Sequence, residues 1–154
     1  MLNVTPWLLI WWNETHYFDQ FKEIFKDDNN KIILPDDGKE VIIYTNSDNN
    51  IYHIWRGGGY EGLDIRDFNF NDPKFYRRAQ RILWIRYILE NQSLRKVFYD
   101  TKNNTLCFIS RELEYTVVLW KIKNTHYKLV TAFHTFNSTR YDTDERFEKY
   151  TFEQ

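Results

Sequence analysis

Several kinds of motif are missing from this sequence of 154 residues. It contains one cysteine, Cys107, which cannot form an internal disulfide and has no neighbouring ligands for zinc. We therefore expect Cys107 to be a small side chain buried in a strand, in a chain that works in a reducing compartment, the cytoplasm. No metal ion or cofactor is expected, because the four histidines are scattered and no carboxylate–histidine spacing fits a metal cage.

Long hydrophobic runs are also missing. The N-terminal run WLLIWW, Trp7–Trp12, is too short to span a bilayer and lacks the basic start and cleavage site of a targeting segment. We interpret it as part of the core, or as a surface that docks a partner or a second copy of the chain. We expect no membrane association. The net charge of −1 argues against general coating of nucleic acid, so anion binding must come from local clusters of cations.

Two common enzyme motifs are missing as well. No G-x-S-x-G is present, so a nucleophilic triad is not indicated. The three consecutive glycines, Gly57–Gly59, match neither a P-loop nor a dinucleotide-binding loop. They indicate either a flexible loop or a backbone that comes close to a ligand.

The sequence does contain an α+β pattern. Apolar spacing predicts an N-terminal helix over 17–27, two short strands around the turn 35–38, and a second helix over 73–90. From residue 95 the period changes to two, which predicts a four-stranded antiparallel meander packed on the second helix. The fold class expected is α+β, with N-terminal helices followed by a small antiparallel sheet. The chain divides either into an extension, 1–50, and a domain, 51–154, or forms one domain.

The predicted helix 73–90 is basic, since it holds five cations and one anion. Four of these cations recur at helical spacing on a face separate from the apolar one: Lys74, Arg77, Arg78 and Arg81. Such a stripe is typical of a solvated helix surface. The alternative is an anion site, and that interpretation needs support from elsewhere in the chain.

Polar residues near strand ends offer such support. They are His53, Arg56, Tyr60, Arg111, Lys121, Thr131 and Thr135. Each has an ordinary explanation: a lysine protects a strand end, and threonine has high β propensity. Together they suit cleavage of RNA through its 2′-OH, which needs a base, an acid and cations but no metal. In a regular strand Thr131 and Thr135 share one face with Leu129, and His134 lies on the other unless a bulge intervenes.

Three short runs, spread over residues 50–137, resemble one superfamily. They are H-I-x-R at His53–Arg56, F-x-R-R-A-Q-R-I-x-W-I at Phe75–Ile85 and V-T-A-F-x-T at Val130–Thr135. These runs resemble the barnase/EndoU/colicin/RelE-like ribonucleases, specifically their phage and polymorphic-toxin branches. The resemblance implies an α+β fold and a metal-independent endoribonuclease, acting as a toxin or effector on cellular RNA. A cognate antitoxin or immunity protein would be a further partner.

The site expected from these observations has two parts. The catalytic residues are His53, Arg81, Thr131 and Thr135, with His53 as general acid or base and the threonines orienting the scissile group. The substrate-binding residues are Arg56, Tyr60, Arg78, Arg111 and Lys121. Two alternatives remain open: a non-catalytic RNA-binding module, and a protein-binding module of the antitoxin or immunity type.

Overall fold

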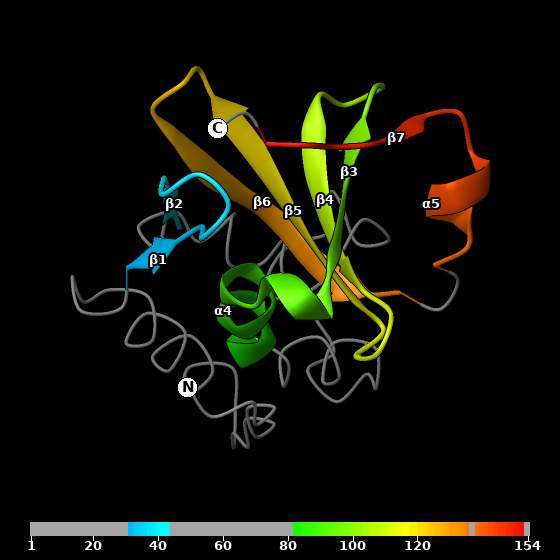
Figure 1. Ribbon diagram of the computed structural model, residues 1–154, viewed down its shortest axis with the longest axis horizontal. Coiled ribbons are helices and arrows are strands. Elements are labelled where there is room, and N and C mark those ends of the chain that lie inside the picture. The colour runs from blue at the N-terminus through cyan, green and yellow to red at the C-terminus, as the bar shows by residue number, and fades with distance from the viewer. Residues whose placement is uncertain (1–30, 44–81, 136–137, 153–154) are drawn as a thin grey trace, which may run out of the picture.

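A computed structural model describes residues 31–43, 82–135 and 138–152 of this chain. These residues build one seven-stranded sheet, in the order β1-β2-β6-β5-β4-β3-β7 (Figure 1). The strands are β1 (Ile32–Ile33), β2 (Glu40–Ile42), β3 (Lys96–Asp100), β4 (Thr105–Ser110), β5 (Tyr115–Ile122), β6 (His126–His134) and β7 (Phe147–Lys149). The helices in this part of the chain are α4 (Ile82–Glu90), α5 (Arg140–Thr143) and the single 3₁₀ turn η4 (Gln92–Leu94).

The sheet is mixed rather than purely antiparallel. Strand β2 pairs with β6 in parallel, with Val41 opposite Tyr127, and every other neighbouring pair is antiparallel. The three turns that connect β3 to β6 each contain a residue in the left-handed region: Asn104 at φ 55°, Glu114 at 53° and Lys123 at 51°. This conformation allows consecutive strands to reverse within a few residues.

The fold class expected from the sequence is therefore wrong. The sheet has seven strands and includes a parallel pair, whereas a four-stranded antiparallel meander was expected. Two of the three additional strands, β1 and β2, form the hairpin expected around the turn 35–38. The third, β7, is three residues long, too short to show an alternating pattern. The predicted helix over 17–27 lies outside the described residues. The boundary predicted at residue 50 lies outside them too, although the β1–β2 hairpin before it belongs to the sheet.

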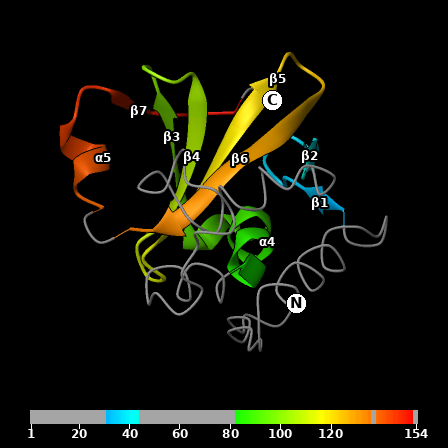
Figure 2. The same ribbon diagram turned by 180° about the vertical axis from the view of Figure 1, so that it is seen from behind.

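Helix α4 packs its apolar face against the sheet. Ile85, Ile88 and Leu89 are fully buried in one cluster with Phe108 of β4 and Val117 of β5. Figures 1 and 2 show α4 lying against one face of the strands. No helix in the described part of the chain is long and apolar enough to cross a membrane.

The expected basic character of this helix has no counterpart in α4 itself. Its one cation, Arg86, donates from Nε to Glu90 one turn later, at 2.8 Å. The cations Lys74, Arg77, Arg78 and Arg81 precede α4 and lie outside the described residues. The described helix is thus a core element.

A buried arginine joins the hairpin, the helix and the sheet. Arg95 follows η4, and its side chain is 2% exposed. Its guanidinium donates to the Ile88 and Leu89 carbonyls at 2.9 and 3.0 Å, which satisfies two carbonyls at the C-terminal end of α4. It also forms a two-bond ion pair with Asp36 in the β1–β2 turn, and it lies 4.7 Å from the centre of the Phe108 ring.

We expect Arg95→Ala to lower the free energy of unfolding by about 3–5 kcal/mol, because it leaves Asp36 without its partner in a nearly buried position. Arg95→Lys should also destabilise the protein, since an ammonium cannot bridge both carbonyls and the carboxylate. Urea unfolding at pH 7 measures both changes. The control is Arg111→Ala, which removes an exposed ion pair with Asp142 and should cost less than about 1 kcal/mol. Equal losses for Arg95→Ala and Arg111→Ala would contradict this role.

Candidate functional site

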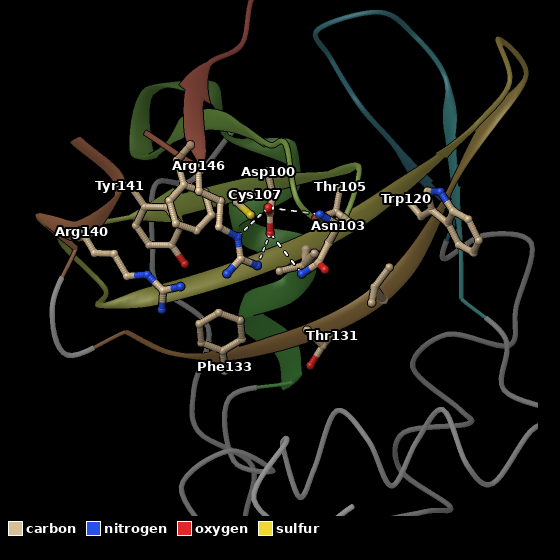
Figure 3. A pocket seen from close by; sticks show the side chains of 13 residues that line it. Asp100, Asn103, Thr105, Cys107, Trp120, Thr131, Phe133, Arg140, Tyr141 and Arg146 are labelled. Carbon is tan, nitrogen blue, oxygen red and sulfur yellow. Dashed lines mark hydrogen bonds and ion pairs between the residues drawn. The ribbon is translucent and has the colours of Figure 1, made fainter. Parts of the chain in front are cut away.

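A cavity of about 450 Å³ lies on the face of the sheet opposite α4 (Figure 3). Its polar lining comes from β3 and the turn after it, from β4 and β6, and from the segment that follows β6: Asp100, Asn103, Thr105, Thr131, Arg140 and Arg146. Its aromatic lining consists of Trp120, Phe133, Tyr141 and Phe147. The cavity therefore combines cations with rings.

A β-bulge in β6 shapes the cavity wall. Val118 pairs with Thr131 and Leu119 pairs with Leu129, so Val130 is an extra residue in the ladder. As a result Val130 and Thr131 both line the cavity, while Leu129 is buried on the α4 side. The regular alternation expected for this strand is thus wrong at Leu129.

The carboxylate of Asp100 accepts several hydrogen bonds at the cavity wall, and the residue is 3% exposed. Arg146 donates to it from Nε at 2.7 Å and from Nη2 at 2.6 Å. The backbone N–H groups of Lys102 and Asn103 and the side-chain amide of Asn103 donate to it as well. These hydrogen bonds link the β3–β4 turn to Arg146, the residue directly before β7.

These contacts determine the charge state of Asp100. Burial acts to raise its pKa, but the hydrogen bonds from Arg146, Asn103 and Lys102 outweigh burial and hold the pKa below its ordinary value of 3.8. The same hydrogen bond raises the pKa of Arg146. Both groups are therefore charged at neutral pH.

A second arginine reaches the cavity from α5. Arg140 lies with its guanidinium carbon 5.2 Å from the centre of the Phe147 ring, and Arg146 lies 5.1 Å from the same ring. In Figure 3 both guanidinium groups point to the same end of the cavity, on either side of the Tyr141 hydroxyl. Tyr141 is buried and packs on Phe147 at 4.5 Å between ring centres, which fixes α5 on the sheet.

The cysteine, the tyrosine and the aspartate that line the cavity do not exchange protons near pH 7. Burial raises the pKa of Cys107 to about 12. Burial also raises the pKa of Tyr141, although a hydrogen bond with Thr116 lowers it. Asp100 stays ionised. Arg140 and Arg146 can stabilise an anion in the cavity, whereas Asp100, Cys107 and Tyr141 are not suited to act as a general base at neutral pH.

The structure brings few of the expected site residues together. Thr131 lines the cavity. Thr135 is buried at the end of β6, where its hydroxyl is hydrogen-bonded to that of Thr116. Arg111 forms an ion pair with Asp142 of α5. Lys121 lies two residues after Leu119 on β5 and therefore projects from the α4 face of the sheet, away from the cavity. His53, Arg56, Tyr60, Arg78, Arg81 and the side chain of His134 lie outside the described residues.

Several lining residues were missed in the sequence. Trp120 could have been found, because strict alternation along β5 places it opposite Leu119, on the face of Val118. Arg140 and Arg146 lie in a segment of mixed charge with no periodic pattern, so nothing local marks them. Within the described ranges, no three His, Cys, Asp or Glu side chains are grouped as metal ligands.

Comparison with known proteins gives no match: no family model, no curated protein and no solved structure matches this chain. The candidate site therefore depends on the geometry alone.

We expect Asp100→Asn to lower the free energy of unfolding at pH 7 by about 1.5–3 kcal/mol, since it removes the charge that Arg146 binds. The pKa of Asp100 is lower in the folded protein than in the unfolded chain. Its carboxylate thus stabilises the fold fully well above the ordinary pKa of 3.8, and this contribution is lost as the pH falls through the folded pKa.

Urea unfolding at several pH values between 7 and 2.5 checks this prediction. The two proteins should differ most at neutral pH, and the difference should shrink as the pH drops below 3.8. A matched control is Asp142→Asn, which removes an exposed carboxylate and should cost less than about 1 kcal/mol. A loss for Asp100→Asn that stays constant from pH 7 to 2.5 would contradict the assigned charge state.

Proposed function

We propose that this chain binds single-stranded RNA in the cavity, with a phosphate held by Arg140 and Arg146. The observation that carries this proposal is the pair of guanidinium groups at one end of an aromatic cavity. Arg146 uses Nε and Nη2 to hold Asp100, which leaves Nη1 for a ligand. Arg140 contacts the Phe147 ring and forms no ion pair with a carboxylate of the described residues.

The size and lining of the cavity favour an unpaired nucleotide. A volume of about 450 Å³ is typical of sites for small ligands, and it leaves no room for a duplex to enter. Unstacked RNA bases bind on aromatic rings and on guanidinium planes, and the lining supplies both. A binding module fits the net charge of −1, because two arginines lie together beside the Phe147 ring at one end of the cavity.

Cleavage of the bound RNA is the further step that the resemblance to ribonucleases implies. It needs a group that accepts the 2′-OH proton near neutral pH, and the described lining residues do not supply one. We propose His53 for that role, as the resemblance implies, and treat binding as the function that the described geometry supports best.

Arg140→Gln should weaken binding of single-stranded RNA by about 10- to 100-fold in 0.1 M salt, because a charge-assisted hydrogen bond to phosphate is lost. The slope of log K against log salt concentration should decrease in magnitude by about 0.7, the value for one phosphate contact on a single strand. Fluorescence anisotropy over a salt series measures both quantities.

The control for this experiment is Lys31→Gln, which removes an exposed cation beside β1, near the far edge of the sheet. It should leave the affinity and the slope nearly unchanged. A wild-type protein that binds no RNA at low salt would refute the proposed function. Equal effects of the two substitutions would show that RNA binds elsewhere.

Incubation with total RNA in EDTA tests cleavage separately. If His53 is the general base, the wild type should release fragments that end in 2′,3′-cyclic phosphate, and His53→Ala should lower the rate by about 10²- to 10⁴-fold. A strand with 2′-deoxyribose should bind and stay intact, since the nucleophile is missing. RNA that binds and is not cut by the wild type would identify a non-catalytic binding module.

A further inference from the structure

Trp120 is exposed in a position where tryptophan is usually covered. It lies on β5, which has a strand on each side, and yet 48% of its surface is accessible. Among the described residues, the other large hydrophobic side chain that is exposed is Ile33, at the β1 edge of the sheet. Trp120 lines the same cavity as Arg140 and Arg146, so its exposed ring is continuous with the proposed phosphate site.

The ring and the arginines lie at opposite ends of the cavity. Arg146 is hydrogen-bonded to Asp100 of β3, which places this arginine two strands away from β5, across β4. Trp120 lies on β5, and two strand spacings amount to about 10 Å. Figure 3 shows the same arrangement, with Arg140 and Trp120 at the two ends and Thr131 between them.

We infer that Trp120 is a second subsite, which stacks a base of the bound strand beyond the nucleotide whose phosphate the arginines hold. This inference rests on the proposed function. A span of about 10 Å is nearly three times the 3.4 Å step between stacked bases, so the two ends contact different nucleotides. The protein would then select strands of at least two or three nucleotides over mononucleotides.

The surroundings of Trp120 favour a nucleic acid strand over a protein partner. Lys128 of β6 is its direct neighbour across the β5–β6 pair. A protein interface buries a contiguous apolar patch, whereas one exposed ring beside a lysine is typical of a stacking platform for bases.

A length series tests the inference. The probes are adenosine 5′-monophosphate and oligoadenylates of two, three, four and six nucleotides, measured by calorimetry at fixed salt. We expect affinity to increase sharply at two or three nucleotides. Trp120→Ala should weaken binding of the hexanucleotide by about 5- to 150-fold, the range for loss of one stacked base, and leave the mononucleotide unaffected.

Two further variants complete the experiment. Trp120→Phe keeps a flat ring and should retain most of the affinity for the hexanucleotide, even if Trp120→Ala proves too unstable to measure. Ile33→Ala removes the other exposed hydrophobic side chain and should change nothing. The second subsite is refuted if the wild type binds mononucleotide and hexanucleotide equally well. It is also refuted if Trp120→Ala and Trp120→Phe both bind the hexanucleotide like the wild type. In either case the arginine site stands. If no probe binds at all, the proposed function itself fails.

Discussion

The buried guanidinium of Arg95 is the contact on which the arrangement of this fold depends. It joins segments that are 59 residues apart in the chain, because it pairs with Asp36 of the hairpin and also bonds the last carbonyls of α4. Once these segments are joined, β2 lies beside β6 and the helix lies against β4 and β5. Tyr127 of β6 adds a hydrogen bond to Asp37 in the same turn. The buried charge of Arg95 thus orients the hairpin, the helix and the sheet. An apolar residue at position 95 would leave one carboxylate and two carbonyls without hydrogen-bond donors.

The two faces of the sheet differ in the residues that cover them. The face under α4 is closed by apolar packing, with Ile85, Ile88 and Leu89 excluding water. The other face has a smaller apolar cluster and, beside it, the charged cavity. The bulge at Val130 connects the two, since it turns Thr131 toward the cavity and keeps Leu129 in the core. The rigid, buried face therefore provides a stable frame for the polar groups of the other.

Local pattern predicted part of this fold, and long-range contacts decided the rest. The strands at 96–134 alternate over five to nine residues each, and the hairpin around Pro35 has a recognisable turn, so both were found from the sequence. The parallel β2–β6 pair and the β3–β7 pair connect residues far apart in the chain, and no local signal specifies them. The cavity was missed for the same reason. Arg146 reaches the cavity because it binds Asp100, which is remote in the sequence. Arg111 was predicted to bind the ligand, but it pairs with Asp142 instead.

The position of α5 and β7 in the chain has a consequence for how the protein is made. Arg140, Tyr141, Arg146 and Phe147 all come after the strands on which they pack. A ribosome releases β3 to β6 first, and these strands can pair with their neighbours as they emerge. The arginine end of the cavity cannot form until residue 147 has left the exit tunnel. A nascent chain thus has a folded sheet before it has the arginine end of the cavity, and translation that stops between β6 and β7 would yield a partly folded protein without the proposed phosphate site.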